Sequence, residues 1–134
     1  HDGARPLVTE KIITDTFEAA KEFGACCAAV PVKDTIKIAG TDGFVEATPD
    51  RSRLYAVQTP QVFSAPLILE AYRKLVAEDE ILKTAGIQIT DDAMVVETML
   101  KHPVKLVESS YENIKITTPE DMEVAMRFLT GRDA

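Results

Sequence analysis

The most informative part of the sequence is TEKIITDTFEAAKEFGACCAAV, residues 9–30, in which a helical pattern runs directly into the pattern of a buried strand. Between Thr9 and Phe23 the apolar side chains recur at helical spacing, and Gly24 is a residue that commonly ends a helix. Residues 25–30 are uniformly apolar, which is typical of a strand covered on both faces. A helix followed at once by such a strand predicts an α/β domain with a mostly parallel sheet.

The segment that follows has the pattern of a projecting hairpin. Residues 32–38 and 44–48 alternate polar and apolar side chains, and Gly40-Thr41-Asp42-Gly43 supplies the turn between them. Because both strands are polar, we expect this β-arm, about residues 31–53, to project from the body of the domain. Such an arm is either a dimerisation element or an ordinary surface excursion.

The rest of the chain alternates between helices and strands. Residues 54–57 predict a short strand that leads into a loop at 58–61. Further along, the pattern predicts a helix from about Ala65, a helix capped by Thr90-Asp91-Asp92, strands at 104–107 and 113–116, and a last helix that starts at Thr118-Pro119. The side chains that we expect the last helix to bury are Met122, Ala125, Phe128 and Leu129.

Composition excludes several classes of protein. The 134 residues suffice for one domain, and 46% hydrophobic with 28% charged residues is typical of a globular protein. A net charge of −7 argues against a nucleic-acid binder, and no apolar run approaches the ~20 residues that span a membrane. Cys26 and Cys27 are adjacent and have no other cysteine to pair with, so we expect buried thiols and a reducing, cytoplasmic compartment.

Candidate site residues lie in the predicted loops and at the ends of strands. Asp2 and Arg5 flank the small residues of HDGARP, which indicates either an active-site loop or an ordinary turn. Arg5, Arg51 and Lys115 together suit a phosphate group, because Arg binds phosphate as a fork and Lys as a point charge. Asp2 suits a ribose hydroxyl or a divalent cation. Loops at the carboxyl ends of parallel strands converge, so we expect these groups to meet.

Other polar residues favour plainer interpretations. Asp91 and Asp92 are more typical of helix capping than of metal binding. His1 suits a structural hydrogen bond, and His102 has no nucleophile near it in the sequence. No Ser–His–Asp or Cys–His arrangement, zinc-ligand spacing or Gly-rich phosphate loop occurs in these 134 residues.

Five segments taken together resemble the 2-C-methyl-D-erythritol 4-phosphate cytidylyltransferase family, and the resemblance runs over essentially the whole chain. The segments are HDGARPLV at 1–8, PVKDTIK at 31–37, PDRSRLYAVQTPQVF at 49–63, ITDDAMVVE at 89–97 and NIKITTPEDMEVA at 113–125. The resemblance implies part of a Rossmann-like nucleotidyltransferase fold that works as a homodimer through its β-arm. It also implies a reaction that joins CTP to methylerythritol phosphate in non-mevalonate isoprenoid biosynthesis, with Mg²⁺ required.

Roles for individual residues follow from this resemblance. Arg51 and Lys115 match the cations that position the methylerythritol phosphate, and Arg51 and Thr35 would be supplied to the neighbouring subunit's site. Lys115 would contact both the substrate and the nucleotide. Thr59 matches a substrate contact.

The HDGARP loop is similar to the family's loop between nucleotide and substrate. Asp2 would reach the substrate, the nucleotide or the metal, Arg5 would bind the substrate, and Ala4 would approach the cytidine nucleotide through its backbone.

The sequence departs from the family at its start and at Met94. Members normally begin with a strand and a Gly-rich loop that hold the triphosphate, and this chain begins about 100 residues later than they do. Residues 1–134 would therefore form the substrate-side and C-terminal part of one domain, and we expect the isolated chain to be inactive without an N-terminal half. A small residue is expected where Met94 stands.

Two other functions remain open from the sequence. A pentitol-phosphate cytidylyltransferase, acting on ribitol 5-phosphate, would share the NIKITTP and QTPQ segments. A non-catalytic dimerisation fragment is the second alternative, although it would have no need of Arg5, Arg51, Thr59 and Lys115 together.

Overall fold

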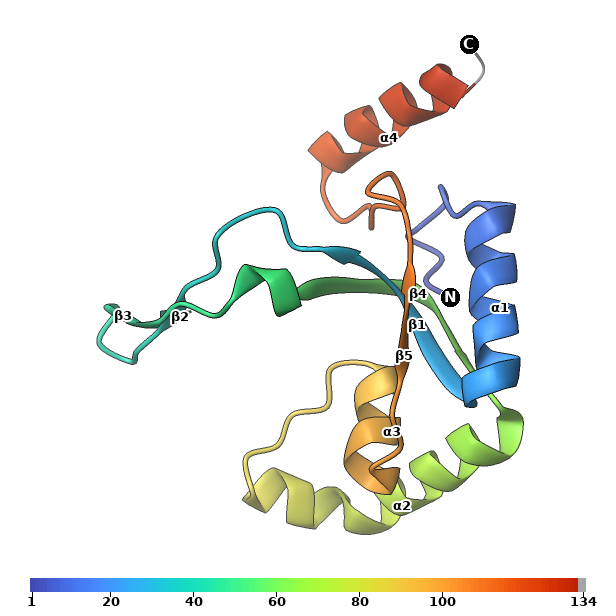
Figure 1. Ribbon diagram of the computed structural model, residues 1–134. Coiled ribbons are helices and arrows are strands. Elements are labelled where there is room, and N and C mark those ends of the chain that lie inside the picture. Colours follow the sequence, from blue (N-terminus) through green and yellow to red (C-terminus); the bar gives the residue numbers. More distant parts are fainter. Residues whose placement is uncertain (133–134) are drawn as a thin grey trace.

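The computed structural model describes residues 1–132 and is built around a three-stranded sheet (Figure 1). Its strands are β1 (Ala25–Pro31), β4 (Tyr55–Phe63) and β5 (Lys105–Glu108), in the order β4-β1-β5. The central strand β1 pairs in parallel with β5 and antiparallel with β4. The α/β class is confirmed.

The sheet is mixed, so the expectation of a mostly parallel sheet needs correction for these residues. The chain leaves β1 through the arm and returns directly along β4, which makes the two strands antiparallel, as in any hairpin. It reaches β5 only after two helices, and such a crossover connection allows the parallel pairing.

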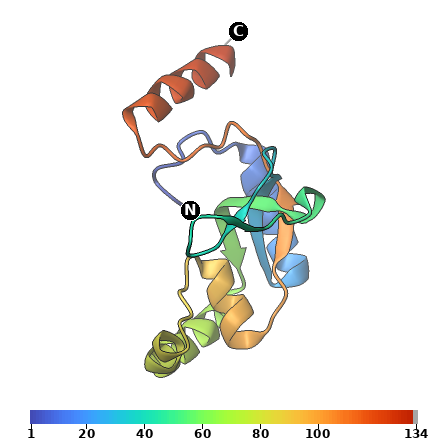
Figure 2. The same cartoon turned by 90° about the vertical axis from the view of Figure 1, so that its left-hand side faces the viewer.

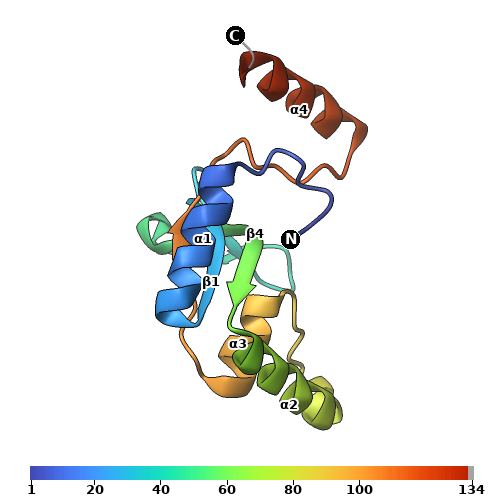
Figure 3. The same cartoon turned by 90° about the vertical axis from the view of Figure 1, so that its right-hand side faces the viewer.

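Helices cover both faces of β1, as its apolar sequence predicts. Helix α1 (Glu10–Phe23) lies over one face (Figure 3), and the thiol of Cys26 donates to the carbonyl oxygen of Thr16 in this helix. The preceding residue, Ala25, points the other way and packs with Val95 and Val96. Residues 25–30 are all buried as a result.

The second face is covered by α2 (Ala65–Thr84) and α3 (Asp92–Leu100), which pack against each other around Ala71.

The cap of α1 is the expected one, since the Thr9 hydroxyl accepts from the amide of Ile12 and Gly24 ends the helix at a φ of 81°. No helix within residues 1–132 combines the length and apolar character that a membrane crossing requires.

The arm projects from the sheet as predicted (Figure 1). It contains β2 (Ile38–Ala39), β3 (Val45–Ala47) and the short 3-10 helix η1 (Arg51–Arg53), with β2 and β3 paired antiparallel. Both strands are exposed along their whole length. The position of the arm therefore depends on what holds its base.

Three local expectations are wrong. Residues 58–61 belong to β4 and form no loop, although the pairing with β1 is irregular there and the Thr59–Pro60 peptide is cis. Residues 113–116 form no strand, because this segment runs as a loop whose Ile116 amide donates to the carbonyl oxygen of Ala4. The last helix, α4 (Pro119–Arg132), starts where expected but extends away from the sheet (Figure 2). Ala125 is buried and Phe128 is half-buried, whereas Met122 and Leu129 are exposed because no sheet formed by residues 1–132 lies beneath them.

Candidate functional site

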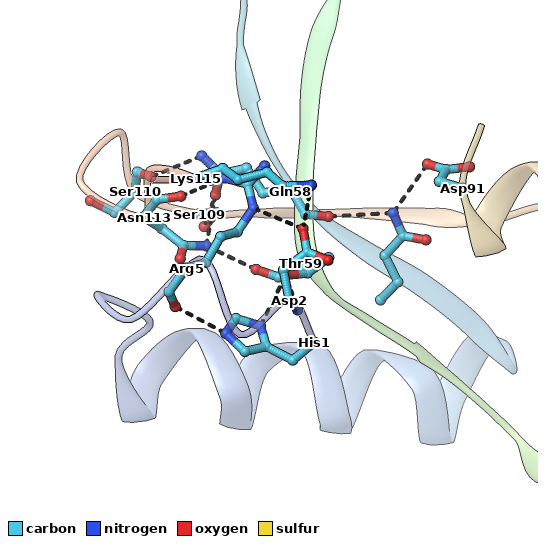
Figure 4. A network of polar contacts seen from close by, with 11 residues as sticks. His1, Asp2, Arg5, Gln58, Thr59, Asp91, Ser109, Ser110, Asn113 and Lys115 are labelled. Atoms are coloured by element: carbon cyan, nitrogen blue, oxygen red, sulfur yellow. Dashed lines mark hydrogen bonds and ion pairs between the residues drawn. The ribbon is translucent and has the colours of Figure 1, made fainter. Parts of the chain in front are cut away.

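Three segments that are distant in sequence meet at one end of the sheet (Figure 4). They are the N-terminal loop, the middle of β4 and the loop of residues 109–117. The backbone amide of Asp2 donates to the hydroxyl of Thr59 over 3.0 Å, and the Arg5 guanidinium donates to the carbonyl oxygen of Asn113 over 2.7 Å. A cavity of about 350 Å³, open to solvent, lies beside these contacts.

Four of the predicted site residues line this cavity. They are Asp2, Arg5, Thr59 and Lys115. The side chains Gln58, Gln61, Thr90, Asp91 and Asp92 line it as well. Of the charged groups that were expected to meet, Asp2, Arg5 and Lys115 do so, whereas Arg51 does not within this subunit.

Asp2 lies between the two cations of the cavity. Its carboxylate oxygen Oδ2 is 3.2 Å from Lys115 Nζ and 3.8 Å from Arg5 Nε. The Asp2 and Lys115 side chains are 37% and 49% exposed, so both remain accessible from solvent. An anionic ligand entering here would meet two positive groups that a single carboxylate already holds side by side.

Arg5 is the more deeply placed of the two cations. Its side chain is 13% exposed, and its Nε has no hydrogen-bond partner among residues 1–132. Burial lowers the pKa of Arg5 from its ordinary value, and the nearby Asp2 carboxylate partly opposes this effect. The guanidinium remains protonated at neutral pH, because arginine does not lose its proton in proteins.

Asn113 is the buried centre of the site. Its side-chain amide donates over 2.9 Å to both the side-chain oxygen of Gln58 and the carbonyl oxygen of Thr59. Gln58 in turn accepts from the Ser109 hydroxyl and donates to the Ser110 carbonyl oxygen. Through these bonds the loop that carries Lys115 is fixed against β4.

Gln61 connects β4 to the start of α3. Its side chain donates to Asp91 Oδ2 over 3.1 Å and accepts from the amide of Ala93 over 3.0 Å. The other oxygen of Asp91 accepts from the amide of Met94, which is the helix cap that the sequence predicts. Asp92, in the first turn, accepts from the Tyr72 hydroxyl, and this bond raises the pKa of Tyr72 to about 12.

Gln58, Gln61 and Asn113 are the functional residues that sequence reasoning missed. Gln58 and Gln61 lie in the segment QTPQ and Asn113 lies in NIK, and both segments belong to the family resemblance. None of the three carries a charge, so the sequence pattern predicts no role for them. A polar side chain inside a segment that becomes buried is the only signal that could have identified them, since buried polar groups need partners.

Three predicted residues, Ala4, Thr35 and Arg51, are not part of the cavity lining. Thr35 and Arg51 are exposed on the arm, and the Arg51 guanidinium donates to the carbonyl oxygen of Lys33. Within this subunit neither reaches the cavity lining.

His1 and Ala4 complete the N-terminal loop. His1 bridges the Thr59 hydroxyl and the Arg5 carbonyl oxygen at 3.0 Å each, in agreement with the structural interpretation of this residue. Ala4 accepts the Ile116 amide through its carbonyl oxygen, so its backbone lies against the NIK segment.

Within residues 1–132, no group of three or more His, Cys, Asp or Glu side chains is arranged to hold a metal ion. Asp91 and Asp92 are committed to the cap and to Tyr72, which leaves Asp2 as the carboxylate of the cavity nearest the cations. Asp2 could therefore supply a carboxylate to a divalent cation whose other ligands include substrate oxygens and water.

Sequence comparison gives matches along almost the entire chain. A family model described as IspD: 2-C-methyl-D-erythritol 4-phosphate cytidylyltransferase matches residues 1–131. Proteins of that description from Desulforamulus reducens and Alkaliphilus oremlandii are 51% and 54% identical over 99% and 98% of the chain. The chain covers 53% and 52% of these two proteins, and so spans about half the length of the curated relatives that it matches.

Solved structures give the same result. The crystal structure of 4-diphosphocytidyl-2C-methyl-D-erythritol synthase from Anaerococcus prevotii matches with a TM-score of 0.85 and 37% identity, over 97% of this chain and 57% of the other. The 2-C-methyl-D-erythritol 4-phosphate cytidylyltransferase from Thermus thermophilus matches with a TM-score of 0.75 and 33% identity, over 96% and 59%. These likenesses support a nucleotidyltransferase fold for the described residues.

Proposed function

Because the chain belongs to the 2-C-methyl-D-erythritol 4-phosphate cytidylyltransferase family, we propose that it forms the substrate-side part of an enzyme that transfers a cytidylyl group from CTP to 2-C-methyl-D-erythritol 4-phosphate. A phosphate oxygen of the acceptor attacks the α-phosphorus of CTP, a new P–O bond forms, and pyrophosphate leaves with the electrons of the broken P–O bond. The product is the cytidine diphosphate derivative of methylerythritol, an intermediate of isoprenoid biosynthesis.

The observation that carries this proposal is the convergence of Asp2, Arg5, Thr59 and Lys115 on one cavity. Two phosphorylated reactants repel each other, so the site must neutralise both while it holds them in line. Arg5 and Lys115 supply the two positive charges on this side of the site. The chain needs no covalent intermediate for such a reaction, since positioning and charge stabilisation supply the catalysis.

The roles of the individual groups follow from their exposure. Lys115 is half exposed at the mouth of the cavity, so its ammonium can contact the acceptor phosphate and the α-phosphate of CTP where they meet. Arg5 lies deeper and is held by the Asn113 carbonyl oxygen, which suits a fixed contact to the acceptor. The Thr59 hydroxyl and Asp2 line the same cavity, and the nucleotide contact of the Ala4 backbone is part of the proposal.

Mg²⁺ is proposed as the metal of the reaction, with Asp2 as its one carboxylate ligand from this chain. Mg²⁺ usually binds through one or two carboxylates together with substrate phosphates, so a carboxylate beside the proposed phosphate site fits this ion. When bound, the ion would offset the negative charge of the phosphates. Asp2 is otherwise held between Lys115 and Arg5, and this keeps its carboxylate at the junction.

We further propose a cytoplasmic homodimer in which the arm of each subunit reaches the other's site. The proposal is supported by the positions of Arg51 and Thr35, which are exposed on the arm and away from the cavity of their own subunit. Residues 1–134 would be one part of a single nucleotidyltransferase domain, consistent with a chain that covers about half of its relatives' length.

The test is pyrophosphate release from CTP and Mg²⁺, with methylerythritol phosphate and ribitol 5-phosphate as parallel acceptors. We expect release with methylerythritol phosphate only. The chain is assayed alone and after addition of the N-terminal half of a relative, because we expect the isolated chain to be inactive. Release with ribitol phosphate only, or with neither acceptor after addition, would contradict the proposal.

A further inference from the structure

Tyr111 contacts the base of the arm at two points. Its hydroxyl donates to the carbonyl oxygen of Pro31, the last residue of β1, over 2.6 Å. Its ring lies under the ammonium of Lys33, with Nζ 3.8 Å from the ring centroid. One side chain therefore contacts both the end of β1 and Lys33, in the segment that enters the arm.

Arg51 reaches the same part of the arm from the returning side. Its guanidinium donates to the carbonyl oxygen of Lys33 over 2.7 Å, and the amide of Val32 donates to the carbonyl oxygen of Leu54 over 3.0 Å. Lys33 is thus held between Tyr111, which contacts its side chain, and Arg51, which contacts its backbone.

Tyr111 also belongs to the loop that builds the cavity. The carbonyl oxygen of its neighbour Ser110 accepts from the side chain of Gln58 and from the amide of Asn113. Lys115 lies four residues after Tyr111. Any displacement of this loop would therefore move groups both at the cavity and at the base of the arm.

An arm of this kind has little rigidity of its own. Its paired strands contain two and three residues, and isolated two-stranded hairpins are marginal in water. The direction in which it points is consequently determined by the contacts at its base.

From these contacts we propose that Tyr111 is a positioning residue, which fixes the base of the arm, and with it Arg51, relative to the loop that carries Asn113 and Lys115. The inference rests on the proposed function in one respect, namely that Arg51 acts at a phosphate site. The geometry itself, a tyrosine that joins the arm to the site loop, is independent of that role.

Two variants separate the two contacts. Tyr111→Phe removes the hydrogen bond to Pro31 and keeps the ring beneath Lys33, whereas Tyr111→Leu removes both. Tyr55→Leu is the matched control, because Tyr55 has the same 43% exposure and lies opposite Pro31 in the sheet, but its hydroxyl makes no hydrogen bond within residues 1–132.

The first measurement is amide hydrogen exchange on the folded chain. In Tyr111→Leu we expect exchange of the Val32 amide to be about tenfold faster, with the Ile116 amide unchanged, because opening is local to the arm base. Tyr111→Phe should show an intermediate effect, and Tyr55→Leu none. If Val32 keeps its protection, or if Ile116 loses protection equally, Tyr111 does not position the arm.

The second measurement is the steady-state kinetics of cytidylyl transfer by the chain after addition of the N-terminal half. Tyr111→Leu should lower kcat by about tenfold with an unchanged KM for CTP, since a displaced Arg51 affects alignment more than nucleotide binding. A normal rate for Arg51→Ala alongside a loosened arm in Tyr111→Leu would refute the role of Arg51 and leave the positioning by Tyr111 standing. A slow Arg51→Ala enzyme together with normal exchange and kinetics in Tyr111→Leu would refute the positioning.

Discussion

The side-chain amide of Asn113 donates to the carbonyl oxygen of Thr59 over 2.9 Å, across 54 positions of sequence. This bond joins the loop that carries Lys115 to the strand that carries the Thr59 hydroxyl (Figure 4). Asn113 is fully buried, so its donors have no water to replace their protein partners. Four predictions follow from this arrangement and from its surroundings.

Replacing Asn113 with Ala should destabilise the fold. The change leaves the Thr59 carbonyl oxygen without its Asn113 donor and removes one of the donors to Gln58, and unsatisfied buried acceptors cost about 1–3 kcal/mol. Urea unfolding measures the loss of free energy. Gln88→Ala, at an exposed position on the chain, should change stability by less than about 0.5 kcal/mol. An Asn113→Ala chain as stable as the parent would show that the bond to Thr59 contributes nothing.

In assays that contain the added N-terminal half, replacing Lys115 with Ala should reduce cytidylyl transfer while leaving the fold stable. Lys115 is half exposed and its ion pair with Asp2 is accessible to water, so little stability depends on it. Loss of one charge that stabilises the transition state costs about 10²–10³-fold in kcat. Lys101→Ala, a change at an exposed lysine outside the cavity lining, is the matched control and should retain the parent rate. Equal rates for the two variants would show that Lys115 has no role in the reaction.

Mixed dimers test whether Arg51 acts in the partner's site. Arg51→Ala and Lys115→Ala subunits should each be nearly inactive alone, but a mixture should regain activity. One of the two sites in a mixed dimer would then combine an intact Lys115 with an intact Arg51 from the neighbouring subunit. Rates are measured in the presence of the N-terminal half, after the subunits are unfolded and refolded together, with each variant refolded alone as the control. If Arg51 served its own subunit, mixing would restore nothing.

The cysteines should be unreactive in the folded chain. Burial raises the pKa of the Cys27 thiol from 9.0 to about 12, with smaller contributions from nearby acidic groups, and burial also raises that of Cys26. The neutral thiol therefore stabilises the fold fully below about pH 9, and this contribution is lost as the pH rises towards 12.

An aromatic disulfide reagent at pH 8 measures this accessibility. We expect no reaction on the minutes scale in buffer and two reactive thiols per chain in guanidinium chloride, because the thiolate is the reacting form. The Cys27→Ser variant should show one reactive thiol after unfolding. Rapid reaction of a thiol in the native protein would contradict the burial.

Much of the fold could be predicted because it depends on short-range patterns. The cap at Thr9, the stop at Gly24 and the Pro at the first position of α4 all act within one turn of helix, so the local sequence specifies them. The buried character of β1 was equally predictable from its uniform apolar run.

The errors lie where the outcome depends on distant partners. Residues 113–116 have alternating side chains but no neighbouring strand with which to pair, so they run as a loop against Ala4. The apolar positions Met122 and Leu129 have helical spacing, yet spacing alone does not supply a surface to cover them. The antiparallel direction of β4 likewise follows from the return of the arm, which no periodicity encodes.

The same division applies to the site. Charge and the order of the motifs were enough to single out Asp2, Arg5, Thr59 and Lys115, because charged and hydroxyl groups can be recognised from the sequence alone. The uncharged groups that hold them, Gln58 and Asn113, became evident only from their contacts, since a buried amide is recognised by the partners that satisfy it. Local chemistry thus identified the charged and hydroxyl groups of the candidate site, whereas long-range hydrogen bonding determined how they are held together.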